Sequence, residues 1–399
     1  MPRPAVIKPD HFPWFDYSRY TFSLGLEVGP SAYLSGHSAS EYDSDDRRIV
    51  VRGGMAEQAR TAYAKVERIL ETAGFTLADV VRIVENVTLD GIEHYAEADL
   101  VRAELFGSNA PAVNTVVVQR LLRPAAWIEV EVTASKSPRE TYGVTSAGRA
   151  AYAPAVETGG VVYLSTVSPL DAAGEVVGRD DVAAQVRQIF ENAQRTLAQC
   201  GLDLGNVVKT NETIRPAALA DYRATGRIRK EFLGPVYPAA AGIVQEQASV
   251  DQDVLISYDF VASVHDGVAV NPGWDRYAKL TYSPAVKAGD ILFMSGQAAL
   301  DPVTERAVHA GDIGAQAEYT YGNIVEVLDA TGFGPENLIK TIEYVTPSGL
   351  GRYRDVAAVR EKLLREPWPA STGALCHSLL RPEFEIEIDP MAIDIGEGV

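Results

Sequence analysis

The sequence predicts three tandem copies of a small α/β domain, each with the element order β-β-α-β-α-β-β over roughly 120 residues. Three helical blocks align with one another without a gap, at residues 57–74, 184–201 and 315–332. A β-rich run with a small polar tip precedes each block, and the tip serines, Ser35, Ser165 and Ser295, follow one another at intervals of 130 residues. Repetition in register indicates three copies of one domain in a single chain.

Each aligned block predicts an amphipathic helix. In the first block the apolar positions recur at helical spacing and give one stripe for packing on a sheet; they are Ala59, Ala62, Tyr63, Val66, Leu70 and Ala73. A glycine closes each block, at Gly74, Gly201 and Gly332, and fits the left-handed C-terminal cap of a helix. We therefore expect three helices that end at these glycines.

Strands flank these helices in every copy. Runs rich in Val, Ile and Tyr follow the first helix, a second amphipathic helix comes next, and alternating runs such as WIEVEVTAS and EIEIDPMAI close the copy. The polar stretches 137–150 and 265–274 have neither periodicity and are the natural linkers. The predicted domains are therefore residues 1–140, 141–268 and 269–399.

The first and third copies share more with each other than with the second. Trp14 and Trp274 precede the matching Phe22 and Tyr282 by eight residues, and LLRP recurs at 121–124 and 379–382. The second copy has diverged furthest in these segments.

Composition excludes several classes of function. The chain has 399 residues, 46% of them hydrophobic, and a net charge of -18 that would repel a phosphate backbone. Its start, MPRPAVIKPDHFPWFDY, has no apolar run of signal-peptide length, and no later run approaches the roughly 18 apolar residues of a membrane span. Cys200 and Cys376 are too few for a disulfide framework, and no metal or nucleotide motif is present. We expect a cytoplasmic protein without metal or cofactor that does not bind nucleic acid.

The order of elements, the AQ...AG helix, the Ser-Gly tip and the closing IEIE-like strand together resemble the RidA/YjgF (Rid) family, three times over nearly the whole chain. Members of this family are similar in fold to chorismate mutase of the trimeric α/β type. They assemble as trimers whose sheets face a central barrel, with a ligand cleft at each subunit boundary. The resemblance therefore implies that the three linked copies close into an intramolecular pseudo-trimer with three clefts that can diverge.

The resemblance also implies candidate cleft residues. In deaminating members a tyrosine and the Ser-Gly tip line the cleft, and a carboxylate on the last strand positions the water that hydrolyses an imine. The tyrosine position is occupied here by Phe22, Tyr152 and Tyr282, and the tip by Ser35-Gly36, Ser165-Thr166 and Ser295-Gly296. The acidic position is Glu131, Asp259 and Asp389, so that an acid or base is available in every copy.

One position departs from the family pattern. Where the family reads Pro-Ala-Arg, with the arginine holding a substrate carboxylate, this chain has Val113, Ala240 and Ser371 after the Pro-Ala pair. Ser371 stays a candidate for substrate binding, but none of the three side chains offers the planar, charged fork of a guanidinium. We therefore expect the chain not to hydrolyse amino-acid-derived enamines and imines, while a neutral or cationic substrate remains open.

A basic residue three positions before a glutamate recurs in all copies, as Arg82 and Glu85, Lys209 and Glu212, and Lys340 and Glu343. Residues three apart in a strand point to opposite faces, so these need not be paired. Two interpretations stay open. The glutamates are solvated or pair with a neighbouring strand or lobe, or they project into the barrel or clefts as general acids or bases.

The third copy has the richest set of titratable groups. Alternation from Ser371 places His377 on the face where the family has its arginine, and its matching positions are Gln119 and Glu246. His377 beside Asp389 and Glu343 would suit proton transfer near pH 7, although a histidine in a strand is more often structural. His37 either extends toward a cleft or lies on a surface loop, and Cys376 is expected in the core.

These observations favour a Rid-like hydrolase or related acid-base enzyme that acts on a small metabolite, with imine-type hydrolysis of a C–N bond as one form. The candidate catalytic residues are Asp389, Glu131, Asp259, Glu343 and His377. The alternative is a small-molecule-binding protein without catalysis. We expect a monomeric pseudo-trimer, and a dimer of such rings stays open.

A lesser alternative is a cyclic-amide ring-opening hydrolase. Cyanuric acid hydrolase and barbiturase have a similar three-repeat architecture and use repeated Ser-Lys pairs. The tip serines recur here, but the basic residue of the first copy is Arg82, and arginine stays protonated and activates serine poorly. RNA cleavage ranks lowest because of the negative charge.

Overall fold

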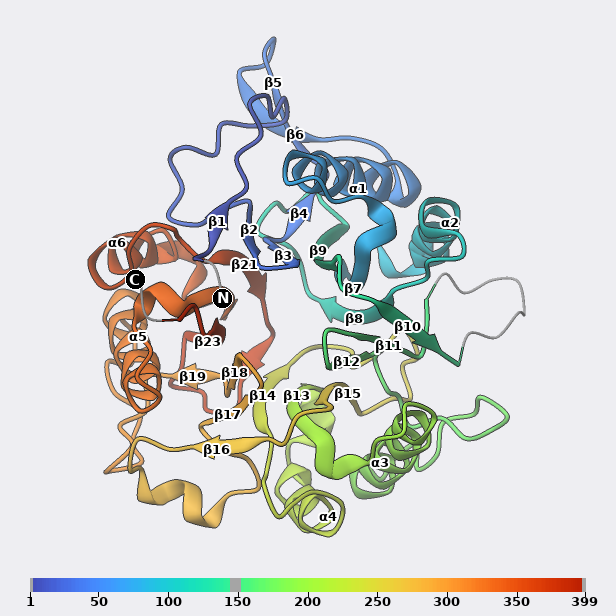
Figure 1. Ribbon diagram of the computed structural model, residues 1–399, viewed down its shortest axis with the longest axis vertical. Coiled ribbons are helices and arrows are strands. Elements are labelled where there is room, and N and C mark those ends of the chain that lie inside the picture. Colours follow the sequence, from blue (N-terminus) through green and yellow to red (C-terminus); the bar gives the residue numbers. More distant parts are fainter. Residues whose placement is uncertain (1–2, 144–151, 397–399) are drawn as a thin grey trace.

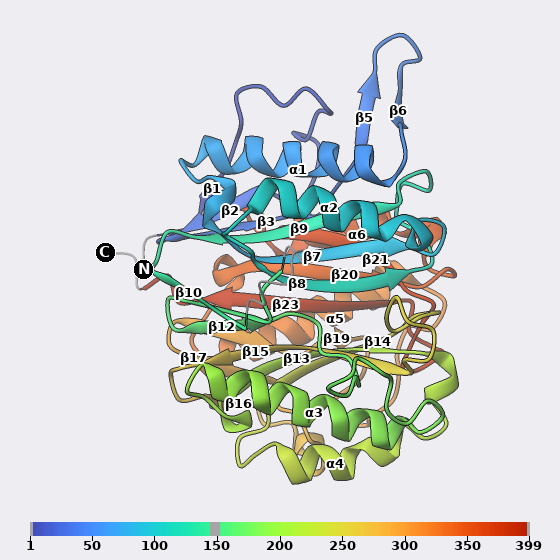
Figure 2. The ribbon, with the colours of Figure 1, turned by 90° about the vertical axis from the view of Figure 1, so that its right-hand side faces the viewer.

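In the computed structural model, which describes residues 3–143 and 152–396, three repeats lie around a common axis (Figure 1). Each repeat places its helices on the outside of the ring and its sheet toward the centre, and the side view shows the sheets between the two outer helical layers (Figure 2). Among the described residues, no helix is both long enough and apolar enough to cross a membrane. The predicted pseudo-trimer of three α/β domains is confirmed.

The first repeat forms a sheet in the order β1-β2-β3-β9-β7-β8, with β4 paired to β9. Its strands are β1 (Ala5–Val6), β2 (Gly25–Val28), β3 (Ser31–Leu34), β4 (His37–Ser38), β7 (Val80–Thr88), β8 (Ala112–Val118) and β9 (Ile128–Ser135), and its helices are α1 (Met55–Thr72) and α2 (Tyr95–Phe106). The strands β5 (Ser40–Asp43) and β6 (Arg48–Val51) form a separate hairpin that projects beyond α1 in both views (Figures 1 and 2).

The second repeat has the sheet order β10-β11-β12-β15-β13-β14-β22. Its elements are β10 (Arg139–Tyr142), β11 (Ala155–Thr158), β12 (Val161–Leu164), α3 (Val182–Gln199), β13 (Val207–Ile214), α4 (Thr225–Phe232), β14 (Ala239–Val244) and β15 (Ile256–Ser263). The last strand of this sheet, β22 (Ser378–Leu379), comes from the third repeat. The third repeat therefore contributes one strand to the second sheet.

The third repeat repeats the order of the first, β16-β17-β18-β23-β20-β21, with β19 paired to β23. Its elements are β16 (Val268–Val270), β17 (Ala285–Ala288), β18 (Ile291–Met294), β19 (Gln297–Ala298), α5 (Ile313–Asp329), β20 (Leu338–Val345), α6 (Asp355–Leu363), β21 (Ala370–Leu375) and β23 (Ile386–Ile393). In each repeat the second helix links two parallel strands, as in a βαβ unit.

The helix ends follow the sequence prediction, whereas the linkers differ from it. Gly74, Gly201 and Gly332 have φ angles of 70°, 71° and 76°, which confirms the left-handed cap. The stretches expected to be linkers contain the edge strands β10 and β16, which pair with β11 and β17. These strands are too short for a period of two to show in the sequence. Residues 144–150 of the first linker lie outside the described residues.

The sheets bury both faces. On the outer face the apolar stripe of α1, including Ala59, Tyr63 and Val66, packs against the first sheet. On the inner face, side chains of neighbouring sheets such as Val81, Val208 and Val286 share one cluster near the axis. Burial on both faces explains why the central strands read as nearly continuous apolar runs.

Main-chain hydrogen bonds at the Pro-Ala pairs fasten each repeat to the next. The carbonyl oxygen of Pro111 accepts from the amide of Ala153 at 2.8 Å, that of Pro238 from Ser283 at 2.9 Å, and that of Pro369 from Ser23 at 3.1 Å. The last of these bonds closes the ring between the third and first repeats. The same contact therefore occurs at all three boundaries.

The three carboxylates expected in the clefts face the central channel instead. Asp389 pairs there with Lys209 of the second repeat, and Glu131 pairs with Lys340 of the third at 3.0 Å. These four side chains are less than one-tenth exposed. The resemblance implied cleft positions for these acids, but alternation along the last strand fixes only the face of the sheet and not the distance from the axis.

The boundary between the first and second repeats lacks such a direct pair. Asp259 lies in the channel and accepts a hydrogen bond from Thr166 at 2.6 Å, while Arg82 donates to Asn114 at 2.7 Å. Burial raises the pKa of Asp259 to about 6, and the charge of Arg82 offsets this only in part. Of the three inner carboxylates, Asp259 is therefore the one without a directly contacting cation.

Asp259→Asn is expected to stabilise the protein above pH 6. The folded pKa is raised from 3.8, so the protonated carboxyl favours folding; that stability is full below about pH 4 and is lost as pH rises through 6. Asparagine carries no charge to desolvate and can still accept from Thr166. The variant should gain about 1–2 kcal/mol at pH 8 and nothing near pH 4, measured by urea unfolding.

Asp389→Asn is the matched comparison. It leaves the buried ammonium of Lys209 without its counter-ion and should cost about 2–4 kcal/mol at pH 8. A stabilising effect of this variant, or a destabilising effect of Asp259→Asn at pH 8, would contradict the difference between the two boundaries.

Candidate functional site

A cleft between the second and third repeats is the candidate functional site. It encloses about 950 Å³, including space open to solvent. The second repeat contributes Glu212, Tyr222, Arg229 and Ala241 to its walls, and the third contributes Trp274, Arg276, Tyr277, Tyr282, Gly296 and Glu387. We call it the second–third cleft. Its mixed polar and aromatic lining suits a small metabolite.

Glu387 provides the buried acid of this cleft. It lies on β23, two residues before Asp389 on the same face, and its side chain is buried. Burial and the charge of Asp389 together raise the pKa of Glu387 to about 8, although Lys209 and the backbone amide of Gly242 oppose the shift. At neutral pH Glu387 is therefore mainly protonated and can donate a proton.

Gly296 and Ala241 let the tip pack closely against this acid. A β-carbon at Gly296 would collide with the Glu387 carboxyl group and lie 3.0 Å from the β-carbon of Ala241. Only glycine fits the tip at this point. The cleft therefore depends on two small residues, one from each repeat.

The residue matching Ala241 differs at the other two boundaries, and there its side chain makes hydrogen bonds across the boundary. The strand registers align Ala241 with Asn114 and Thr372. Asn114 bridges Arg82 and the carbonyl oxygen of Leu164, while Thr372 donates to Glu131. At the third–first boundary, the γ-methyl of Thr372 would lie 2.7 Å from a β-carbon at Gly36. The small side chain of Ala241 therefore distinguishes the second–third cleft.

The acid also differs between boundaries. The positions matching Glu387 are Glu129 in the first repeat and Ser257 in the second, from the same registers. Burial and the neighbouring Glu131 raise the pKa of Glu129 to about 8, with Lys65 opposing. Ser257 donates to the carbonyl oxygen of Ala248 and offers no acid. The first–second boundary thus lacks this group entirely.

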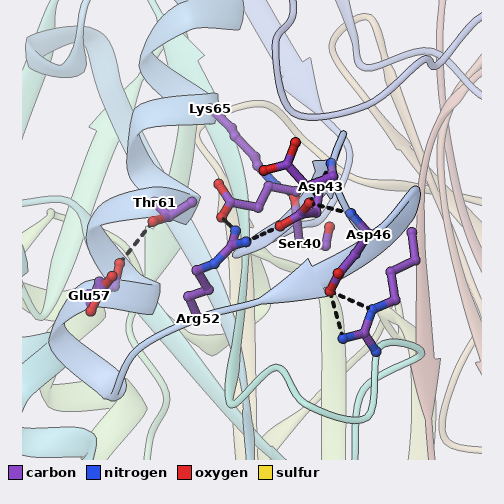
Figure 3. A network of polar contacts seen from close by, with 10 residues as sticks. Ser40, Asp43, Asp46, Arg52, Glu57, Thr61 and Lys65 are labelled. Carbon is purple, nitrogen blue, oxygen red and sulfur yellow. Dashed lines mark hydrogen bonds and ion pairs between the residues drawn. The ribbon is translucent and has the colours of Figure 1, made fainter.

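Lys65 anchors the projecting hairpin of the first repeat. It extends from α1 toward Ser40 at the start of β5 (Figure 3). At the other end of β5, Arg52 contacts Asp43. Its ammonium donates to the carbonyl oxygens of Ser38, at 2.6 Å, and Ser40. The aligned side chains in the other repeats, Asn192 and Asn323, bond loop carbonyls in the same way. Lys65 therefore has a structural counterpart in each repeat.

The tip serines fasten the boundaries. Ser295 donates its hydroxyl to the carbonyl oxygen of Ser283 at 2.6 Å and accepts from the amide of Ala240 at 2.8 Å. Ser35 bonds Ser23 and Ser371, and Ser165 bonds Ala153 and Val113, in the same arrangement. Each hydroxyl proton is already directed at a carbonyl group. The serines are thus structural in this conformation and Ser371 contributes its backbone amide.

The recurring glutamates face the outer helices. Glu343 is fully buried and pairs with Arg360 of α6 at 2.7 Å, while Tyr321 and Tyr353 donate to it at 2.7 and 2.5 Å. Glu85 with Arg102, and Glu212 with Arg229, form the same arrangement. The glutamates are thus buried and not solvated, and each pairs with a helix of its own repeat and not with a neighbouring strand or lobe. Of the three, Glu212 also lines the second–third cleft. Lys209 and its counterparts point the opposite way, as three-residue spacing in a strand predicts.

The remaining candidates are dispersed. His377 contacts Glu246 of the second repeat at 2.6 Å and is not beside Asp389 or Glu343. Tyr152 is 42% exposed, and Phe22 stacks on Tyr20 at a centroid distance of 5.0 Å. Among the tyrosine and tip candidates, only Tyr282 and Gly296 line the second–third cleft.

His37 and Cys376 both lie inside the protein. His37 is 3% exposed, and burial lowers its pKa to about 3. It is therefore neither a surface-loop residue nor a proton carrier near pH 7. Cys376 is fully buried in the core, as expected from the sequence.

Comparison with known proteins places the chain in a family. A family model described as endoribonuclease L-PSP matches it three times, at residues 17–136, 144–264 and 275–394. The chain belongs to the Rid family. Three copies of the Rid domain therefore account for almost the whole sequence, and membership supports a role in binding or transforming a small metabolite.

Rid relatives match one repeat at a time. A RutC family protein of Pyrococcus horikoshii is 30% identical over 115 residues, which is 29% of this chain and 86% of that protein. The 3-aminoacrylate deaminase RutC of Acinetobacter baylyi is 32% identical over 115 residues, which is 29% of this chain and 88% of that protein. Each relative thus corresponds to about one repeat.

A solved structure described as a chorismatase spans more than one Rid repeat. It matches with a TM-score of 0.50 and 17% identity, covering 79% of this chain and 93% of its own. At this identity the similarity concerns the fold alone. The Rid-like arrangement thus occurs in another chain that is larger than a single repeat.

Two cleft residues were missed from the sequence. Glu387 belongs to the run EIEID, in which the Rid resemblance pointed to Asp389 as the acidic position. Arg276 lies two residues after Trp274, and the matching residue of the first repeat is Asp16. A charge reversal inside an otherwise shared Trp-x-x-Tyr pattern was the available signal for Arg276.

Ala241→Thr is expected to close the second–third cleft. The third repeat accommodates threonine at the matching position, so the melting temperature should change little, whereas a threonine side chain would enter the space beside Gly296. Affinity for a small carboxylate such as fumarate should fall at least about tenfold in titration calorimetry. Thr372→Ala is the control and should leave that affinity unchanged. Unaltered binding by Ala241→Thr would show that the ligand lies elsewhere.

Proposed function

We propose that the chain is a Rid-family acid-base enzyme that hydrolyses the C–N bond of a small imine or enamine in the second–third cleft. The observation that carries this proposal is the Glu387 carboxyl group, which lines the cleft with its pKa raised to about 8. A carboxyl group that stays protonated at neutral pH is suited to general acid catalysis.

The chemistry needs one proton donor that can also act as acceptor. Glu387 donates its proton to the imine nitrogen while water adds to the carbon atom, and the resulting carboxylate takes a proton from that water. Collapse of the carbinolamine then releases ammonia and leaves a carbonyl compound. No cofactor takes part, since the reaction is a hydrolysis without oxidation or reduction.

The surroundings of Glu387 support this assignment. Burial also raises the pKa of Tyr282 and holds that of Tyr277 at about 12, so that both phenols stay protonated as hydrogen-bond donors. Both line the same cleft. The similarity to a protein named 3-aminoacrylate deaminase agrees with C–N chemistry on a small substrate.

The geometry argues against the cyclic-amide alternative. A nucleophilic serine needs a base to accept its proton, but each tip serine donates to a carbonyl oxygen. Lys209 and Lys340 donate to the carbonyl oxygens of Met294 and Leu34 and contact carboxylates. Neither lysine is therefore placed as a free base.

The test follows ammonia release from imines generated in situ. A serine dehydratase supplies 2-aminoacrylate, and an amino-acid oxidase supplies imines with neutral, singly charged and doubly charged side groups. We expect acceleration of at least one substrate over its spontaneous hydrolysis. Absence of acceleration across the whole panel would leave a binding role without catalysis.

Glu387→Gln is expected to lower the accelerated rate by about 10²- to 10⁴-fold, because glutamine cannot donate an acidic proton. Glu129→Gln is the matched variant, since Glu129 occupies the same position at the third–first boundary, where Thr372 lies beside Gly36 and donates to Glu131. It should keep the wild-type rate. Loss of activity in Glu129→Gln with retention in Glu387→Gln would assign the reaction to the other boundary.

The pH profile gives a second prediction. The active form requires protonated Glu387, so kcat/KM should be flat near neutrality and fall about tenfold per unit as pH rises above about 8. Residual activity of Glu387→Gln should lack this descent. An active enzyme whose rate rises through pH 8 would mean that Glu387 acts as a carboxylate and not as the acid.

A further inference from the structure

The second–third cleft contains arginine side chains that its own carboxylates do not neutralise. Arg276 belongs to a short helical turn at Asp275–Lys279, and its guanidinium lies over the ring of Tyr277, 5.0 Å from the centroid. Its Nε atom is buried and has no hydrogen-bond partner within the described part of the chain. A buried donor of this kind needs a partner, because a buried N–H group without a hydrogen bond costs free energy.

Arg381 is the second available cation. It lies in the LLRP segment before β23, lines the same cleft, and uses one nitrogen to donate to the carbonyl oxygen of Glu305 at 2.8 Å. No carboxylate among the described residues forms an ion pair with Arg276 or Arg381. Each retains donors that could bind an anionic group.

The other charged groups of the cleft cancel or are neutral. Arg229 contacts Glu212 at 3.3 Å and donates to Thr281 at 2.9 Å, so it is already occupied. Glu387 is mainly protonated at neutral pH, as described above. The cleft therefore has an excess of positive charge in a chain whose net charge is -18.

The matching positions at the third–first boundary show that one of these two charges is particular to the second–third cleft. Asp16 replaces Arg276 there, while Arg123 of the first LLRP segment matches Arg381. The strand position after Pro-Ala, which holds an arginine in the family, is Ala240 beside the second–third cleft. Arg276 is therefore the cation that distinguishes the second–third cleft, whereas Arg381 has a counterpart at the third–first boundary.

We propose that the second–third cleft selects a small dicarboxylate, with Arg276 binding one carboxylate group and Arg381 the other. This inference rests on the proposed function, because it names the substrate class of that same cleft. A guanidinium fork matches the planar carboxylate group and can donate two parallel hydrogen bonds to it. Two such forks in one cleft discriminate against a ligand with a single carboxylate group. Such a ligand can pair with only one of the two arginines and leaves the other unpaired.

Binding of fumarate and crotonate tests the proposal directly. The two acids share a rigid carbon skeleton, and crotonate has a methyl group in place of one carboxylate. Titration calorimetry at pH 7 should show fumarate binding at least about tenfold more tightly than crotonate, with one site per chain. Equal affinities, or a preference for crotonate, would overturn the proposal.

Variants assign the preference to residues. Arg276→Gln and Arg381→Gln should each reduce fumarate affinity to about that of crotonate while the melting temperature stays near that of the wild type. Arg123→Gln is the matched control at the other boundary and should preserve the preference. A preference that survives both cleft variants would overturn the assignment, as would its loss in Arg123→Gln.

Two further measurements separate this inference from the proposed reaction. Glu387→Gln should still bind fumarate, so dicarboxylate binding can be established when hydrolysis fails. Inorganic phosphate is the other anion with the same charge, and it should not displace fumarate at equal concentration. Displacement by phosphate would replace the dicarboxylate with a phosphate-bearing ligand and refute the proposed class.

Discussion

The hydroxyl group of a single tip serine holds each boundary of the ring in register. At the closing boundary Ser35 donates to Ser23 in its own repeat and accepts from the amide of Ser371, which lies 336 residues away in the chain. The same pair of bonds occurs around Ser165 and Ser295. These bonds and the neighbouring Pro-Ala contacts recur at each boundary, so the same backbone hydrogen bonds hold all three boundaries together. We therefore look to the side chains at the boundaries for differences in function.

A few side chains distinguish the second–third boundary from the other two boundaries. Ala241 leaves space where Asn114 and Thr372 make hydrogen bonds across the boundary. Glu387 supplies an acid that the first–second boundary lacks, and Arg276 supplies a charge that the third–first boundary reverses. Covalent linkage allows this divergence, since a trimer of identical chains would carry each substitution three times. One chain can therefore carry different side chains at each of its three boundaries.

The sequence predicted the fold because repetition, helical periodicity and terminal glycines agree on the same elements. It predicted the site less well. Glu387 and Asp389 lie on one face of β23, and a period of two cannot say which reaches the cleft and which the axis. The Rid resemblance pointed to Asp389, which lies near the axis with Glu131 and Asp259. The outward orientation of Glu343 could not be read without Arg360, which approaches from a helix 17 positions later.

The central claim is that one cleft of the three binds ligand. A crystal structure of the protein grown with saturating fumarate tests it most directly, because all boundaries are seen in one experiment. The account predicts one fumarate molecule per chain, in the second–third cleft beside Glu387 and within hydrogen-bond distance of Arg276. Fumarate at the third–first boundary near Glu129, in the central channel, or at all three boundaries with equal occupancy would contradict it.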